Sequence, residues 1–272
     1  MGNDERMSAQ PSVDAVTPPT PPDALPGARS AGGYRRNTSF RSRRSALSAA
    51  QQRTWARLWP DLGIVAASRH SADAPDEPLN AGARFGRDAP LVLEIGCGTG
   101  TSTLAMAQSE PGVDVIAVEV YRRGLAQLLS AIEREGVSNI RLVRGDAVDV
   151  LESLIAPGSL SGVRVFFPDP WPKARHRKRR LLQPATVALI ADRLQAGGVL
   201  HAATDHPGYG EQIAEVGDAE PRLTRVDPAG PAGTGLPISV VRPTTKYEDK
   251  ARHAGSAVTE LLWQRRFEGR AS

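Results

Sequence analysis

The chain has 272 residues, of which 40% are hydrophobic and 24% charged, the ordinary proportions of a globular protein with enough chain for a sizeable core. Its net charge is only +4 although its pI is about 9.6, so a nucleic-acid partner is permitted but not demonstrated. The single cysteine, Cys97, excludes an internal disulfide and a cysteine-built metal site. Since the chain has neither an apolar run of about 18 residues nor the apolar core of a signal peptide, we expect a cytoplasmic protein that does not span a membrane.

The chain begins with two segments of unlike composition. Residues 1–33 are rich in Pro, Ala, Gly and Ser and cannot bury enough apolar area to offset the entropy of ordering, so we predict a disordered tail. Residues 34–60 begin as a basic arm, with six arginines and no acidic residue from Tyr34 to Arg53. We interpret this arm as a contact for RNA; the alternative is a generic basic linker.

A helix is predicted in the second half of this arm. Ser48, with Gln51 three positions later, forms a capping-box pattern, so the helix should begin there and extend to Pro60. Residues 61–89 contain many Ala, Asp, Pro and Gly residues, and we predict a loop or linker.

From residue 90 onward, short apolar runs alternate with helix-like segments, which predicts a doubly wound, mostly parallel α/β sheet in a domain over 90–272. The C-terminal segments 222–227 and 256–267 suit antiparallel strands at an edge of the sheet, although the last could also be helical. Strands are expected at 91–95, 113–120, 140–145, 163–169 and 197–204, and helices at 101–109, 121–135, 147–155 and about 184–194.

A glycine-rich loop follows the first of these strands. Gly96, Gly98 and Gly100 let the backbone approach a ligand closely. The dinucleotide fingerprint would place its third glycine one residue later, where the chain has Thr101. The spacing resembles instead the first motif of class I S-adenosylmethionine-dependent methyltransferases; a plain tight turn is the alternative.

Three acidic residues accompany this loop. Glu119 ends the second strand, where a carboxylate can accept both hydroxyls of a ribose. Asp146 follows the third strand, where such proteins recognise the adenine, and Glu94 lies beside the glycine loop. For each acid, the alternative is a helix N-cap or a solvent-exposed residue at a strand end.

The sequence FFPDPWPKARHRKRR closes the fourth strand with prolines and continues into a run of cations. Asp169 follows that strand, at the edge where open α/β sheets bind ligands. Its PDPW motif resembles the signature of methyltransferases that act on a planar nitrogen. Trp171 could offer a face for stacking on a base, or it could be a core residue. The six Lys and Arg residues from Lys173 to Arg180 could be a solvated surface, or they could bind the phosphates of RNA.

Together, LEIGCGTG, AVEV, FPDPWPKARHRKRR, AATDHPGY and RPTTKYE resemble the bacterial tRNA (guanine-N7-)-methyltransferase family over roughly residues 34–267. The resemblance implies a Rossmann-like class I methyltransferase fold with a seven-stranded sheet. It also implies that the chain transfers a methyl group from S-adenosyl-L-methionine to N7 of guanine 46 in the tRNA variable loop, leaving S-adenosyl-L-homocysteine and forming 7-methylguanosine. We expect tRNA as the partner, no metal, no obligatory protein partner, and a monomer.

The resemblance also assigns roles to individual residues. Asp169 matches a catalytic acid. The cofactor-binding positions are Glu94, Gly96, Gly98, Gly100, Glu119, Asp146 and Asp169. The substrate-binding positions are Lys173, Asp205, Thr245, Lys246, Tyr247 and Glu248, and the RNA-binding positions are Arg175, His176, Arg177, Lys178, Arg179 and Arg180. Without the resemblance, Asp205 could equally be the N-cap of the following helix and Lys246 a surface cation.

Three other functions are compatible with parts of the pattern. The first is a methyltransferase for another base nitrogen, which PDPW disfavours relative to N-P-P-Y. The second is a non-catalytic RNA-binding module, against which the retained glycine loop and acidic residues argue. The third is a nicotinamide dehydrogenase, which the glycine spacing and the lack of a plausible proton relay oppose.

Overall fold

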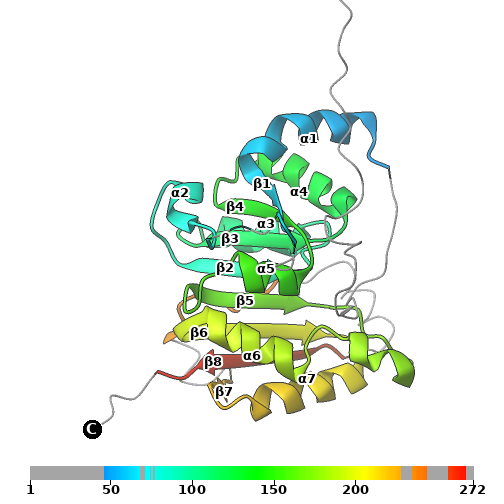
Figure 1. The fold of residues 1–272 in the computed structure, drawn as a ribbon, viewed down its shortest axis with the longest axis vertical. Coiled ribbons are helices and arrows are strands. Elements are labelled where there is room, and N and C mark those ends of the chain that lie inside the picture. The colour runs from blue at the N-terminus through cyan, green and yellow to red at the C-terminus, as the bar shows by residue number, and fades with distance from the viewer. Residues whose placement is uncertain are drawn as a thin grey trace, which may run out of the picture.

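The structure is a computed structural model dominated by one mixed β-sheet with helices on both faces (Figure 1). The strand order is β1-β4-β3-β2-β5-β6-β8-β7. The predicted tail, the basic arm before residue 46 and the Thr245–Glu248 segment lie outside the described residues. The structure describes residues 46–67, 71–73, 75, 77–227, 235–243 and 257–267.

The central strands confirm the predicted parallel sheet. β2 and β3 are buried along their whole length, because helices cover both faces of the sheet, and such strands read as continuous apolar runs in the sequence. Neighbouring central strands pair in parallel. Their bounds are β2 Leu91–Ile95, β3 Asp114–Glu119, β4 Ile140–Arg144, β5 Leu160–Phe166 and β6 Leu194–Thr204.

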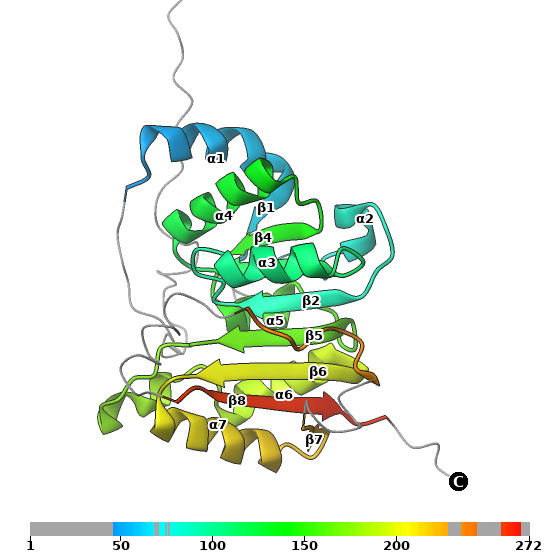
Figure 2. The same cartoon turned by 180° about the vertical axis from the view of Figure 1, so that it is seen from behind.

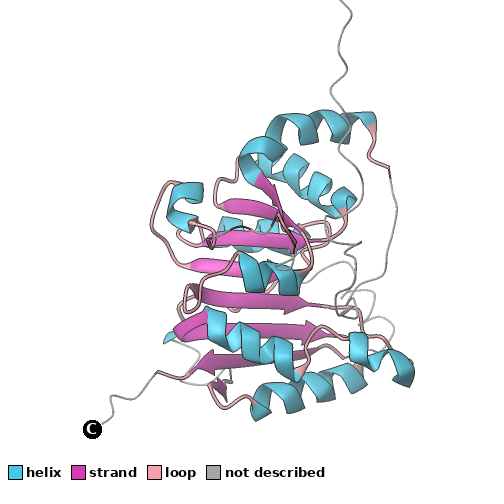
Figure 3. Ribbon diagram, viewed as in Figure 1, coloured by secondary structure: helices cyan, strands magenta, loops and turns pink. Residues whose placement is uncertain are grey.

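The C-terminal edge is antiparallel, as predicted. β8 (Thr259–Arg265) pairs antiparallel with β6 on one side and with β7 (Leu223–Arg225) on the other, so the helical alternative for this segment is wrong. In Figure 3 the arrow of β8 runs opposite to the arrow of β6 beside it. This order of strands matches the class I methyltransferase fold that the sequence resembles.

The opposite edge differs from the prediction. Within the described residues the sheet has eight strands and not seven, because β1 (Gly63–Val65) pairs in parallel with β4. This strand and the short helix α2 (Ala81–Phe85) both lie in the segment predicted as a loop. A strand of three residues is too short to show an alternating pattern, and it forms because the exposed edge of β4 is available for pairing.

Helices α3 to α6 lie where the alternation predicts them, whereas α7 follows β6 in a segment for which no helix bounds were predicted. α1 begins with the predicted capping box, in which the Ser48 hydroxyl accepts from the Gln51 amide and the Gln51 side chain accepts from the Ser48 amide. It runs through Pro60 and does not stop there. The long helices are α1 Ala49–Leu62, α3 Thr101–Ser109, α4 Arg122–Glu135, α5 Ala147–Ser153, α6 Pro184–Arg193 and α7 Pro207–Ala219.

Two apolar cores hold the layers together. Helices α5, α6 and α7 cover one face of the sheet (Figure 1), and their apolar residues form one cluster with Leu93, Val163 and Leu200. Helices α1, α3 and α4 cover the other face (Figure 2), where a second cluster includes Trp55 and Val115. The carboxyl ends of β2 to β6 therefore meet at one edge. Within the described part of the chain, no helix has the length and apolar character needed to cross a membrane.

Candidate active site

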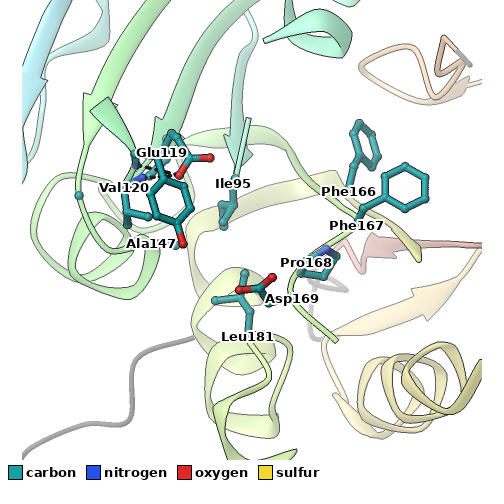
Figure 4. A pocket seen from close by; sticks show the side chains of 13 residues that line it. Ile95, Glu119, Val120, Ala147, Phe166, Phe167, Pro168, Asp169 and Leu181 are labelled. Atoms are coloured by element: carbon teal, nitrogen blue, oxygen red, sulfur yellow. Dashed lines mark hydrogen bonds between the residues drawn. The ribbon is translucent and has the colours of Figure 1, made fainter. Parts of the chain in front are cut away.

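A cavity of about 160 Å³ lies at the carboxyl edge of the sheet, between the segments that follow β2, β3, β4 and β5 (Figure 4). This is the edge at which open α/β sheets bind their ligands. Glu119 and Asp169 contribute the carboxylates of its lining, and most of the other lining residues are apolar. The lining residues are Ile95, Gly96, Val118, Glu119, Val120, Tyr121, Gly145, Ala147, Phe166, Phe167, Pro168, Asp169 and Leu181.

The predicted glycine loop borders this cavity through Gly96, which is one of its lining residues. Gly96, Gly98 and Gly100 all have a positive φ, of 77°, 58° and 79° respectively, so the chain path itself requires glycine. At Gly96 and Gly98 the space where a Cβ would stand is open. The loop therefore exposes its backbone toward a ligand.

Gly124 in α4 is a further glycine of this site that the sequence pattern did not reveal. A Cβ at this position would lie 2.1 Å from the carbonyl oxygen of Gly98. The glycine loop consequently lies directly against α4, and the missing side chain permits the approach. An isolated glycine inside an amphipathic helix was the only signal, and it usually means no more than a tolerated defect.

Glu119 holds the glycine loop to the end of β3. Its Oε2 accepts from the Gly98 amide at 3.0 Å, and its Oε1 accepts from the amides of Val120 at 2.7 Å and Tyr121 at 3.0 Å. Burial raises the pKa of Glu119, the three backbone donors lower it, and the charge of Asp169 adds to the increase. A carboxylate has about four lone-pair sites, so part of its accepting capacity already serves the fold.

Glu94 is a buried acid on the strand before the glycine loop. Its Oε1 accepts from the Thr103 hydroxyl at 2.9 Å, while its Oε2 has no hydrogen-bond partner in the described part of the chain. Burial raises the pKa of Glu94, and the Arg164 charge and the Thr103 hydrogen bond oppose that increase. A buried acceptor without a donor is costly unless a ligand supplies one.

Asp146 lies at the rim, between the lining residues Gly145 and Ala147. It is the N-cap of α5, and its side chain accepts from the Val148 amide at 2.9 Å. The capping role left open by the sequence is therefore present in the structure.

The PDPW loop carries Asp169 to the cavity. Phe167, just before PDPW, and Trp171, its last residue, have φ values of 50° and 42°, a region that non-glycine residues rarely adopt. Such conformations cost on the order of 1–3 kcal/mol each and persist only when surrounding contacts impose them. One such contact is the hydrogen bond that the Phe167 amide donates to the Ala203 carbonyl at 2.8 Å.

The comparison with known proteins assigns the chain to a family. A family model described as "Putative methyltransferase" matches residues 88–261. A protein of Mycobacterium avium (strain 104) named "tRNA (guanine-N(7)-)-methyltransferase" is 64% identical over 98% of this chain and 100% of its own length. Proteins with the same name from Mycobacterium ulcerans (strain Agy99) and Mycolicibacterium gilvum (strain PYR-GCK) are 60% and 68% identical, over 97% and 85% of this chain and 99% and 87% of their own. The chain belongs to the tRNA (guanine-N(7)-)-methyltransferase family.

The site suits the methyl donor of this methyltransferase family, S-adenosyl-L-methionine, which carries an ammonium group and a sulfonium. Two carboxylates, Glu119 and Asp169, face the cavity, and Glu94, which precedes the lining residue Ile95 on β2, adds a buried Oε2 without a hydrogen-bond partner in the described part of the chain. Positive charge on a ligand would offset the cost of burying these acids. No group of His, Cys, Asp and Glu residues suited to a metal ion occurs among the described residues.

In this methyltransferase Trp171 is buried and does not present an open ring face on which a base could stack. Its side chain is only 4% exposed, and the Arg179 guanidinium lies 3.7 Å from the centre of its ring. His176 approaches the same ring edge-on at 5.8 Å. The expectation of an open face for a base is therefore wrong, and the alternative of a core tryptophan is correct.

The basic run forms the short 3₁₀ helix η1 (Ala174–Arg179), and its side chains point in two directions. Four of its cations face solvent: Lys173, Arg175, Arg177 and Lys178. His176 and Arg179 are half-buried against Trp171, and Arg180 is buried. The prediction of RNA contact fits the four exposed cations, whereas the side chain of Arg180 is turned into the protein, because its donors bond carbonyl and amide oxygens there.

Asp205 is exposed at the end of β6, on the same edge of the sheet as Asp169. His206 and not Asp205 is the N-cap of α7, and no side-chain hydrogen bond caps that helix. The alternative structural role for Asp205 is therefore not observed. The remaining predicted substrate positions, Thr245–Glu248, lie beyond the described residues.

Proposed function

We propose that the chain transfers the methyl group of S-adenosyl-L-methionine to N7 of the variable-loop guanine of tRNA, position 46, forming 7-methylguanosine. The observation that carries this proposal is the 64% identity, over 98% of the chain, to a protein named for methylation of tRNA at guanine N7. The cavity at the sheet edge, bordered by Asp169 and followed by exposed cations, supports it.

In this proposal the protein contributes position and charge, because guanine N7 has a free lone pair and no proton to remove. The bound cofactor supplies an electrophilic methyl group. Asp169 and Asp205, with Glu248, would accept hydrogen bonds from guanine N1 and its amino group and stabilise the positive charge that develops on the ring. His176 and His206 are not required as bases. Correct alignment would be the main source of rate enhancement.

The cofactor would lie along the carboxyl edge of β2 to β5. Glu119 would bind the ribose, Asp146 the adenine and Glu94 the amino-acid portion, with the glycine loop supplying backbone contacts. The four exposed cations of the basic run would bind phosphates beside the reacting base. Lys173 and the Thr245–Glu248 segment would contact the substrate, and residues 34–45 would form a second RNA contact. The division into a tail, an arm, a linker and a catalytic domain over 90–272, the monomeric state and the cytoplasmic location belong to the same proposal.

The test is incubation of the purified protein with unmodified tRNA transcripts and methyl-labelled S-adenosyl-L-methionine, followed by nucleoside analysis. The expected result is label in 7-methylguanosine, lost when the variable-loop guanosine is changed to adenosine. Label in another nucleoside would overturn the assignment of the substrate atom. Cofactor binding without any transfer would favour the non-catalytic RNA-binding alternative.

A further inference from the structure

The side chain of Arg180 joins the PDPW loop to helix α7. Its Nε donates to the carbonyl of Pro170 at 2.8 Å, and its Nη1 donates to the carbonyl of Gly208 at 2.9 Å and to Oε1 of Gln212 at 2.7 Å. The guanidinium also lies 4.7 Å from the centre of the Tyr209 ring. Arg180 is only 3% exposed, unlike Arg177 and Lys178, its exposed neighbours in the same run.

We propose that Arg180 is a positioning residue for Asp169: it fixes the Pro170 carbonyl and thereby holds the Asp169 carboxylate at the cavity. This inference rests on the proposed function, because it assigns Arg180 to the catalytic loop and not to the RNA-binding surface. The basic run would then have two roles, with outward cations setting tRNA affinity and Arg180 setting the rate.

The chemistry of the loop explains why a donor is needed at this point. Pro168 and Pro170 have no amide hydrogen, so the backbone of these two residues, which flank Asp169, can be held only through their own carbonyl groups. Phe167 and Trp171 meanwhile adopt unfavourable backbone conformations that require external support. The hydrogen bond from Arg180 to Pro170, one residue after Asp169, supplies that support on the C-terminal side of the carboxylate.

The residues of α7 that Arg180 contacts are themselves held by hydrogen bonds. The Tyr209 hydroxyl accepts from the Leu182 amide at 3.1 Å, and the Gln212 side chain donates to the Leu182 carbonyl at 3.2 Å. The segment after Arg180 and the first turns of α7 are thus bonded to each other. Arginine suits this place because its planar fork reaches two directions at once, which a lysine ammonium on a flexible stem does not.

The cost of burying this cation also indicates a function. No carboxylate pairs with Arg180 among the described residues, and its Nη2 has no hydrogen-bond partner there. Burial lowers the pKa of Arg180, and repulsion from Arg177 adds to that decrease. A buried cation without an anionic partner is expensive to keep for stability alone.

The test separates rate from affinity in the full-length enzyme. Arg180→Gln should lower kcat about 10- to 100-fold and leave the Kd for tRNA within about twofold of wild type. Arg177→Gln should show the opposite balance, with a several-fold weaker Kd and a smaller change in kcat. Arg134→Gln, an exposed arginine at the end of α4, is the neutral control for the loss of one charge. A weaker tRNA Kd with normal kcat in Arg180→Gln would overturn the proposal.

Two further variants distinguish positioning from general stability. Gln212→Met removes one acceptor of Arg180 together with the hydrogen bond to the Leu182 carbonyl, and it should give a smaller kcat loss at unchanged tRNA Kd, even if Arg180→Gln fails to fold. Arg180→Ala should regain part of its kcat when methylguanidinium is added, whereas Asp169→Ala should not. An unchanged kcat in Gln212→Met together with no rescue of Arg180→Ala would contradict the proposal. Failure of the proposed function would be recognised separately, because wild type itself would then form no 7-methylguanosine.

Discussion

The two carboxylates of the cavity differ in what surrounds them. Glu119 is buried and accepts three backbone hydrogen bonds, whereas Asp169 is half-buried and accepts none within the described part of the chain. Part of the accepting capacity of Glu119 is consequently used to hold the glycine loop, whereas all of that of Asp169 is available to a ligand. We therefore expect replacement of Glu119 and replacement of Asp169 to have different effects.

Asp169→Asn keeps the shape of the side chain and removes its charge. We expect kcat to fall about 100-fold, the order seen when one preorganised group that stabilises developing charge is lost. The Kd for S-adenosyl-L-methionine should remain within about threefold, because the glycine loop and Glu119 are unchanged. Single-turnover kinetics and calorimetry would measure both, and a normal rate would refute the catalytic role.

Glu119→Gln should lower both the stability of the fold and the affinity for the cofactor. An amide has one accepting oxygen, so its NH₂ group would face at least one of the backbone donors that now bond the carboxylate. The unsatisfied donors should destabilise the protein by about 1–3 kcal/mol, and the Kd for the cofactor should rise. Thermal denaturation with and without cofactor tests this, and an unchanged Tm would show that the loop does not depend on Glu119.

At the scale of elements, the close contact between α4 and the glycine loop determines whether a larger residue at Gly124 stabilises or destabilises the protein. In an exposed helix, Gly→Ala would be stabilising by about 1 kcal/mol from propensity. Gly124→Ala should instead destabilise by about 1–3 kcal/mol, because its Cβ would lie 2.1 Å from a backbone oxygen of Gly98. It should also weaken cofactor binding by shifting the loop.

Gly112→Ala is the matched control for this substitution. Nothing lies within 4 Å of the place where its Cβ would stand, and its φ is not positive. Denaturant titrations of the two variants should therefore diverge, with Gly112→Ala close to wild type. Equal stabilities would show that the loop moves aside without cost.

The contact between His201 on β6 and Glu260 on β8 predicts that the stability of the fold depends on pH. His201 is buried on β6 and lies 2.6 Å from the Glu260 carboxylate on β8, which Arg242 also approaches. The hydrogen bond from His201 holds the pKa of Glu260 below its ordinary value of 4.5, with burial opposing and the charges of His201 and Arg242 adding to the decrease. An acid with a lowered folded pKa stabilises the fold above its unfolded pKa and loses that contribution as pH falls through the folded value.

Glu260→Gln should therefore lower Tm at neutral pH, and the difference from wild type should disappear below the ordinary carboxylate range. The decrease should be no more than a few degrees, because the Glu260 side chain is 37% exposed and its charge is screened. Thermal denaturation from pH 7 down to about 3 measures this, and a difference that grew on acidification would contradict the sign.

The elements that the sequence predicted well are those determined by local chemistry. The central strands read as apolar runs because they are buried on both faces, and Ser48 and Gln51 identify a helix start through bonds between near neighbours. The prediction failed where the structure depends on contacts between residues that are far apart in the sequence. The charge of Arg180 suggested solvent, but its direction depends on Gly208 and Gln212 in α7. Gly124 depends similarly on Gly98, and β1 forms only because β4 has a free edge.

At the scale of the whole molecule, charge is arranged in two zones along one edge of the sheet. The cavity is acidic, with Glu119 and Asp169 on its walls, and the basic run begins only four residues after Asp169. The small net charge of +4 hides this separation. An acidic pocket suits a cationic cofactor, and neighbouring cations suit a polyanion, so one edge can bind both without mutual competition.

Among the residues of the basic run, the outward cations and not Arg180 should contribute to the salt dependence of tRNA binding. Each phosphate contact contributes roughly 0.7–0.9 to the slope of log K against log salt concentration. Replacing Lys173, Arg175, Arg177 and Lys178 by Gln should therefore reduce that slope by about 3, whereas Arg180→Gln should leave it unchanged. Binding titrations at several KCl concentrations give both slopes. An unchanged slope in the fourfold variant would locate the phosphate contacts elsewhere, with the arginine-rich arm the next segment to remove.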